Sequence, residues 1–187
     1  VVEPIDGTRA FVERGDEWVV SIGVVENGAS VAGVLYNPIR DELWSAFSGG
    51  GAFYNGERLR VSDATELQSA TVSASKKAMA RAGLAETQFP TDHRFLRSLA
   101  HRLARVAKGD VDAALATPGS ADWDLAAALL IVQEAGGQVS DFEGGPIRLN
   151  GATARHPAFV AAGPGLHGAI LKLIGQQKTK TEAEAQE

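Results

Sequence analysis

The chain has 187 residues, of which 44% are hydrophobic and 22% charged, a composition typical of a folded globular protein. Its formal net charge is −5 and it has no long basic block, which argues against a general binder of nucleic-acid polymers or of membrane surfaces. It contains no cysteine, so disulfides, thiolate metal sites and cysteine nucleophiles are excluded and a cytoplasmic location is expected. No apolar run reaches the roughly 20 residues that cross a bilayer.

The first eight residues (VVEPIDGT) combine strand-forming apolar residues with two carboxylates, Glu3 and Asp6, where the predicted strand ends. Gly7 permits a tight turn, and Thr8 adds a hydroxyl beside backbone N–H groups that the turn leaves free. Carboxylate oxygens bind Mg²⁺ and turn amides bind phosphate oxygens, so this segment predicts a site for a cation and a phosphate. The alternative is a strand-end turn with solvated acids, because acid-rich turns are common.

An antiparallel meander is expected after a short polar segment at 9–17, in which Phe11 and Val12 are predicted to face inward. Asn-Gly and Asn-Pro turn signals and a triple glycine separate its short strands. The predicted strands are 18–25, 31–36, 42–47, 52–54 and 58–61. Glycines 49–51 suit either a hairpin turn or a phosphate cradle, and the hairpin is favoured because no helix or Lys-Ser/Thr pair follows.

A polar connection at 62–69 predicts a boundary between a first part (1–64) and a second α/β part (65–176), followed by a polar, frayed tail at 177–187. The second part is expected to contain strands 71–75, 111–116, 138–140, 147–149 and 159–162 and helices 76–82, 93–108 and 165–174. Thr91 or Asp92 is the predicted cap of helix 93–108. The basic residues on one face of this helix could meet a phosphorylated ligand, but they are more typical of a solvated surface.

A further helix is predicted to follow the sequence TPGSADWD at 117–124 and to end at the glycines after Ala135. Ser120 or Asp122 can cap it. Asp124 falls in its first turn, where the helix dipole favours a carboxylate. On its own this signal is weak, because acids in first turns usually only complement the dipole.

Other catalytic motifs find no support in the sequence. The segment GPGLHG at 163–168 has the spacing of a dinucleotide fingerprint, but no second strand or ribose-binding acid can follow it. The four histidines lack metal-site spacing, and neither a G-x-S-x-G elbow nor a complete P-loop is present. Serine-hydrolase and P-loop chemistry are therefore not predicted.

Two motifs together resemble the inositol monophosphatase superfamily: E-P-I-D-G-T at 3–8 and W-D-x-A-A-A…E-A-G-G at 123–137. The specificity lies in the pair and its order, and the resemblance covers nearly all of the chain up to about Ile174. It implies an α/β (α+β) protein with the layered α-β-α-β-α fold of the sugar phosphatases, here without its N-terminal helices. It also implies Mg²⁺-dependent hydrolysis of small phosphate monoesters, inhibited by Li⁺.

Carried over by position, the resemblance implies two or more Mg²⁺ ions and four metal ligands: Glu3, Ile5 through its carbonyl, Asp6 and Asp124. Gly7 and Thr8 would bind the phosphate through backbone amides. Thr8 and Asp6 would be the catalytic residues, with Thr8 helping to orient the attacking water. A pair of metal ions can activate this water and neutralise the leaving oxygen, which requires acids from distant parts of the chain to converge.

Three departures from the family pattern bear on activity and substrate. The family usually has Asp where this chain has Glu3, and the added methylene shifts the carboxylate in a site where Mg²⁺ demands strict geometry. Family members carry a further acidic ligand in an N-terminal region, and since the only methionine here is Met79, we expect further sequence upstream. Thr117 stands where inositol-specific members often place a glutamate, whereas Asp122 resembles the substrate-binding acid of 3′(2′),5′-bisphosphate nucleotidases.

The sequence thus predicts a metal-dependent phosphatase acting on an inositol monophosphate or a 3′(2′),5′-bisphosphate nucleotide, with histidinol phosphate as a weaker third candidate. The rival interpretation is a truncated or degenerate homologue that binds metal or phosphate, or only dimerises, without catalysis. The expected partner is a small phosphorylated substrate, with no nucleic-acid polymer and no membrane. The resemblance also leaves a homodimer as an alternative assembly, because family members commonly form homodimers.

Overall fold

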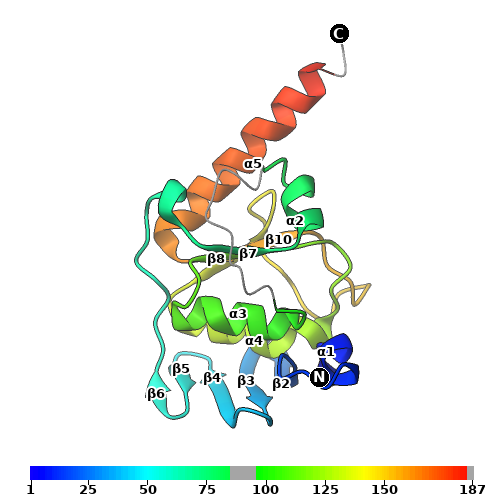
Figure 1. Cartoon of the computed structure of the whole chain (residues 1–187), viewed down its shortest axis with the longest axis vertical. Helices are drawn as coiled ribbons and strands as arrows, with labels where there is room; N and C mark the ends of the chain where they lie inside the picture. Colours follow the sequence, from blue (N-terminus) through cyan, green and yellow to red (C-terminus); the bar gives the residue numbers. More distant parts are fainter. Residues whose placement is uncertain (85–95, 185–187) are drawn as a thin grey trace.

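The computed structural model describes residues 1–84 and 96–184, which fold into alternating layers of sheet and helix (Figure 1). One sheet lies at one end of the molecule, helices α3 and α4 cover it, the second sheet follows, and α2 and α5 lie on its far side. These four layers match the expected α-β-α-β-α order without the first helical layer.

The first sheet is a six-stranded antiparallel meander in chain order, as the turn signals predicted. Its strands are β1 (Val2–Asp6), β2 (Val19–Glu26), β3 (Ala29–Asn37), β4 (Glu42–Phe47), β5 (Gly51–Tyr54) and β6 (Glu57–Arg58). The triple glycine makes the turn between β4 and β5, where the amides of Gly49 and Gly51 donate to the two carboxylate oxygens of Glu134 at 2.7 and 2.8 Å. The hairpin prediction is confirmed, and the amides of this turn bind a carboxylate of the same chain, that of Glu134.

The second sheet has four strands in the order β7-β8-β10-β9, of which β7 and β8 are parallel and the other pairs antiparallel. Its strands are β7 (Val72–Ala74), β8 (Ala113–Ala116), β9 (Gln138–Asp141) and β10 (Phe159–Ala162). Alternate residues of β10 enter different cores: Phe159 packs toward α3 and α4, and Val160 toward α2 and α5. Both faces of this sheet are therefore buried.

The helices are α1 (Thr8–Val12), α2 (Lys76–Arg81), α3 (Leu99–Lys108), α4 (Asp122–Glu134) and α5 (Pro164–Glu184), with a 3₁₀ turn η1 (Leu67–Ser69). Helix α4 packs closely on the first sheet because β3 presents a glycine there. A Cβ added to Gly33 would lie 2.8 Å from the Cα of Ala127, which is closer than side chains tolerate. None of the described helices combines the length and the apolar character needed to span a membrane.

Several local predictions are wrong. Phe11 and Val12 lie on α1 with exposed side chains, because this helix is short and only Ala10 is buried against the protein. Residues 147–149 form no strand, although Leu149 is buried, because its amide bonds Gly28 rather than a neighbouring strand. The tail at 177–187 is not frayed from its start, since α5 continues to Glu184.

Helix α3 begins at Leu99 and not at 93, because the Ser98 hydroxyl accepts from the His101 amide and caps it. The predicted caps Thr91 and Asp92 and the predicted first residues of this helix up to 95 lie outside the described residues. The basic face is not fully solvated either, since His101 and Arg102 are buried.

Candidate active site

Asp6 is the buried acid at the end of β1, with a side chain that the first helix of the middle layer holds in place. It is 9% exposed, and its Oδ2 accepts hydrogen bonds from the Ser98 hydroxyl at 2.5 Å and from the Ala100 amide at 2.7 Å. Burial raises the pKa of Asp6 to about 6; the two hydrogen bonds oppose this rise, and the charge of Asp124 adds to it. The pKa of this acid therefore lies close to neutral pH.

Arg102 is the buried cation of this region. Burial lowers the pKa of Arg102 to about 10, and the charge of Asp6 opposes the effect. Its Nη1 donates to the Leu115 carbonyl at 3.4 Å, a long bond. Neither Ser98 nor Arg102 was predicted as part of the site. A Ser immediately before an apolar helical stretch was the available signal for Ser98.

The turn after Asp6 requires a glycine. Gly7 has φ = 95°, in the left-handed region, and a Cβ there would lie 2.8 Å from the Glu17 carbonyl oxygen. Thr8 follows as the first residue of α1, and its hydroxyl donates to the Ile5 carbonyl at 3.2 Å. The carbonyl, the hydroxyl and the turn amide thus lie within one short segment around Asp6, in which Ile5 and Gly7 are half-buried and Thr8 is exposed.

Asp124 comes from the first turn of α4 in the second half of the chain. Its Oδ2 accepts from the Ala121 amide at 2.7 Å, so Asp124 itself caps the helix that begins after Ala121. The predicted caps are wrong: Ala121 is the cap residue, and neither Ser120 nor Asp122 fills this position. The charge of Asp124 contributes to the raised pKa of Asp6, so the two carboxylates, from distant parts of the sequence, lie within electrostatic range of each other.

Asp122 points into the protein rather than to an open site. Its Oδ1 lies 2.7 Å from Nε2 of His156, and its Oδ2 accepts from the Asn150 amide at 3.0 Å. Both side chains of the Asp122–His156 pair are buried, and backbone bonds between His156 and residues 119–120 fasten the same loops together. This geometry favours a role for Asp122 in fixing the start of α4, and its predicted role in substrate binding stays a prediction.

The predicted metal ligands do not form a closed cluster. Among residues 1–84 and 96–184, no three His, Cys, Asp or Glu side chains are grouped closely enough to hold a metal ion. The charge of Asp124 acts on Asp6, whereas Glu3 is half-buried on β1 and stands opposite Ser21. The oxygen donors suit a hard cation in their chemistry, and the mutual repulsion of two carboxylates is what such a cation would relieve.

A family model described as the inositol monophosphatase family matches residues 1–179 of the chain. The chain belongs to the inositol monophosphatase family. This confirms the resemblance stated from the two motifs.

Relatives in this family are similar over most of the chain. The inositol-1-monophosphatase of Mesorhizobium japonicum is 36% identical over 185 residues, which cover 93% of this chain and 66% of that protein. Nus factor SuhB of Pasteurella multocida is 39% identical, with 93% of this chain and 66% of that protein covered. The IMPase structure of Thermotoga maritima superposes with a TM-score of 0.80 at 34% identity, covering 96% of this chain and 69% of that one.

The chain therefore spans about two thirds of the length of the relatives it matches. Within that span this inositol monophosphatase family member has its E-P-I-D-G-T turn at the end of β1 and its W-D motif at the start of α4. The pair His156 and Asp122 was not foreseen, because residues so far apart in the sequence give no local signal of their contact.

Proposed function

We propose that this protein is a metal-dependent phosphatase that hydrolyses small phosphate monoesters. The observation that carries the proposal is the buried Asp6, held by Ser98 and within electrostatic range of Asp124 from the far half of the chain. The names of the similar proteins support it, since one is an inositol-1-monophosphatase and another a fructose-1,6-bisphosphatase/inositol-1-monophosphatase.

Mg²⁺ is the proposed metal, in two or more ions, with Asp6, Asp124, Glu3 and the Ile5 carbonyl as its ligands. When bound, such a metal activates water and neutralises charge on the phosphate oxygens. The chain's own contribution is positional. Ser98 and the Ala100 amide fix one oxygen of Asp6. The amides that follow the left-handed Gly7 are proposed to bind the substrate phosphate.

The Thr8 hydroxyl is proposed to orient the attacking water. It is the only side-chain hydroxyl of the G-T turn, and it already donates to the Ile5 carbonyl at 3.2 Å. A hydroxyl that donates to a fixed carbonyl keeps its lone pairs directed elsewhere, so it can accept a hydrogen bond from water. The substrate is proposed to be an inositol monophosphate or a 3′(2′),5′-bisphosphate nucleotide, and histidinol phosphate is the weaker third candidate.

The test is phosphate release from inositol 1-phosphate and from 3′-phosphoadenosine 5′-phosphate, with Mg²⁺ and with EDTA. Asp124→Asn is expected to lower Mg²⁺-dependent turnover by roughly 100-fold or more, because it removes a proposed metal-ligand charge. Asp63→Asn is the matched control, since Asp63 pairs with Arg60 and both side chains are almost fully exposed. Unchanged turnover in Asp124→Asn would overturn the metal assignment.

A non-catalytic role is the second candidate. It is favoured by the absence of a closed three-ligand group among the described residues and by the similarity to Nus factor SuhB, whose name denotes a factor rather than an enzyme. It predicts no Mg²⁺-dependent phosphate release from either substrate, together with a folded chain. The same assay therefore decides between the two candidates.

A further inference from the structure

The turn that follows Asp6 is held by its surroundings and not by the helix that it begins. Helix α1 has only five residues, no side chain caps its first turn, and only Ala10 of the helix is buried. A helix this short is not stable on its own in water. The position of Gly7 and Thr8 beside Asp6 therefore depends on the segments that pack against this turn.

Two segments from other parts of the chain pack against Gly7. A Cβ added to Gly7 would lie 2.8 Å from the carbonyl oxygen of Glu17 and 3.3 Å from the Cα of Trp18. The same atom would lie 3.1 Å from the Cβ of Ser98, whose hydroxyl donates to Asp6. The backbone of Glu17 and Trp18 thus lies directly against the turn, so that a shift of this backbone would also shift Gly7.

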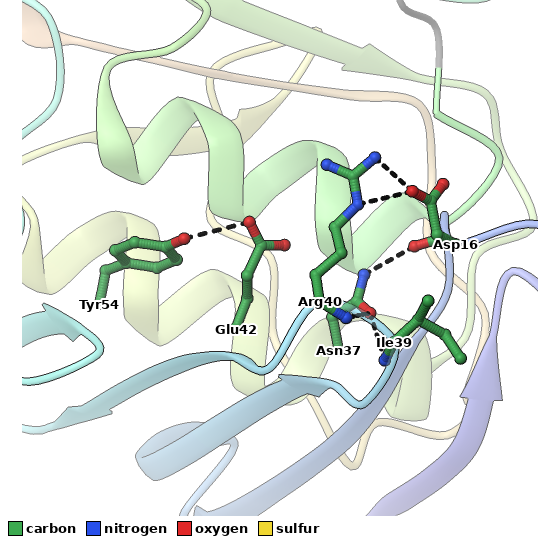
Figure 2. Close-up of polar contacts among 6 residues, drawn as sticks. All are labelled: Asp16, Asn37, Ile39, Arg40, Glu42 and Tyr54. Carbon is green, nitrogen blue, oxygen red and sulfur yellow. Dashed lines mark hydrogen bonds and ion pairs between the residues drawn. The ribbon is translucent and has the colours of Figure 1, made fainter.

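Asp16, the residue before this backbone, is bound twice by the β3–β4 turn (residues 37–41). Its carbonyl accepts a hydrogen bond from Nδ2 of Asn37 at 2.7 Å, and its Oδ2 accepts from Nε and Nη2 of Arg40 at 2.8 and 2.5 Å (Figure 2). Two bonds from one planar guanidinium hold a carboxylate more rigidly than an ammonium does. Asp16 is therefore held at its backbone and at its side chain by the same turn.

Asn37 is itself held in a fixed position. It is 0% exposed at the end of β3, and its Oδ1 accepts from the amides of Ile39 at 3.0 Å and of Arg40 at 3.2 Å (Figure 2). A side-chain oxygen that accepts from amides two and three residues further along fixes the shape of a turn. The oxygen of Asn37 therefore binds its own turn while the nitrogen binds Asp16, and the two segments are joined as one unit.

We propose that Asn37 and Arg40 are positioning residues for the proposed phosphatase reaction, although neither is among its proposed ligands. By fixing Asp16 they fix the backbone that follows it, and this backbone fixes the turn that carries Gly7 and Thr8. The inference rests on the proposed function, in which this turn binds the phosphate and orients the attacking water. A small displacement of the turn should mainly slow the chemical step, because catalysis depends steeply on the geometry of the reacting groups.

Arg40→Lys tests the proposal without a change of charge. Lysine keeps the positive charge but cannot bind Asp16 through two nitrogens, and the loss of this partly exposed ion pair should have little effect on stability. In ¹H–¹⁵N NMR spectra of the whole chain with EDTA, the backbone amide signals of Gly7 and Thr8 are expected to shift. Arg60→Lys is the matched control, because Arg60 belongs to an exposed ion pair outside both turns, and it should leave these signals in place.

Asn37→Ser should have the larger effect. A serine hydroxyl can still accept from the amides of its own turn, but it is too short to reach the Asp16 carbonyl. We expect kcat for phosphate release, per folded molecule, to fall by roughly threefold in Arg40→Lys and by roughly tenfold or more in Asn37→Ser, with KM nearly unchanged. A purely structural role would lower the folded fraction, measured by urea unfolding, and leave kcat per folded molecule unchanged. If Asn37→Ser does not fold, Arg40→Lys alone decides.

The two readouts separate this inference from the proposed function. If the wild type releases no phosphate, the proposed function fails, while shifted Gly7 and Thr8 signals would still establish that the β3–β4 turn positions these residues. Unshifted signals would overturn the proposal. Shifted signals together with an unchanged kcat would overturn it as well, because the turn would then move without any effect on the reaction.

Discussion

The two sheets of this protein differ in how their faces are used. The second sheet is buried on both faces, and every residue of β8 and β10 is buried. Among the described helices, α3 and α4 cover the inner face of the first sheet, while its outer face exposes apolar side chains that include Ile22, Val24 and Phe47. The candidate site lies at the end of β1, in the first sheet.

The difference shows where this fold tolerates unfavourable features. A buried carboxylate with a raised pKa, a left-handed turn and an open apolar face all belong to the first sheet. The strands of the second sheet contain none of these and provide mainly packing. We therefore expect substitutions in the second sheet to act on stability alone, and those around β1 to separate stability from function.

The largest expected effect is in the second sheet, from Phe159→Ala. Phe159 is fully buried, so its removal should lower the free energy of unfolding by about 3–5 kcal/mol through lost burial and a residual cavity. Phe47→Ala is the matched control, because Phe47 is 57% exposed on the first sheet and should lose no more than about 1 kcal/mol. Urea unfolding measures both. Equal losses would contradict the contrast between the sheets.

Asp6→Asn is expected to stabilise the metal-free protein. The pKa of Asp6 is raised in the folded state to about 6 from an ordinary 3.8, so folding favours the protonated acid and stability is lost as the pH rises through this window. Above it the ionised Asp6 destabilises the fold by up to about 3 kcal/mol, which a neutral amide avoids.

The measurement for Asp6→Asn is urea unfolding with EDTA, at about pH 7 and about pH 4. The variant should be the more stable protein at the higher pH, and the difference should shrink toward zero at the lower pH, where Asp6 is protonated. Asp63→Asn, at an exposed acid, should show neither effect. A variant that is less stable than the wild type at both pH values would contradict the assigned cause.

Gly7→Ala should destabilise the protein by about 1–3 kcal/mol, because Ala disfavours φ = 95° and its Cβ would meet the Glu17 carbonyl oxygen. If the Gly7 turn presents the phosphate-binding amides, turnover should fall further than the loss of folded protein explains. Gly56→Ala is the control: it also has a positive φ, but its added Cβ would meet no atom within 4 Å. Unfolding and phosphate release should be measured on both variants. Together they separate the effect of backbone strain on stability from the effect of a lost phosphate contact on turnover.

The smallest effect on stability is expected from Ile22→Thr on the outer face of the first sheet. Ile22 is exposed on β2, so the change should alter the free energy of unfolding by less than about 0.5 kcal/mol. It should nevertheless weaken any self-association through this apolar face, which sedimentation velocity can measure over a concentration series. Unchanged self-association would place any contact between copies elsewhere.

The first sheet was predictable because its turn residues and its alternating strand residues are local features of the sequence. Strand β4 has the predicted bounds of 42–47, because turn signals precede and follow an alternation of buried and exposed residues. The prediction of a strand at 147–149 was wrong, although this segment has apolar residues like those of a strand. A buried loop and an edge strand can have the same pattern of apolar and polar residues. Only the partner of the Leu149 amide, Gly28, distinguishes them.

The candidate site was predictable in its residues and not in their partners. Asp6 and Asp124 were identified from motifs, but their hydrogen bonds to Ser98 and to the Ala121 amide depend on how α3 and α4 meet β1. The burial of Asp122 against His156 is likewise set by the packing of two loops. Contacts between distant segments decide the charge state and the exposure of these acids. Such contacts cannot be predicted from the neighbouring residues in a single sequence.

The bond between Glu134 and the turn of Gly49 and Gly51 gives this protein an internal reporter in hydrogen exchange. Amides at the tip of an exposed hairpin normally exchange with solvent quickly, but these two donate to a carboxylate at the end of α4. Their exchange rates should therefore follow the opening of that helix end rather than that of the hairpin. Slow exchange at the tip would indicate an intact contact between the first sheet and the middle layer.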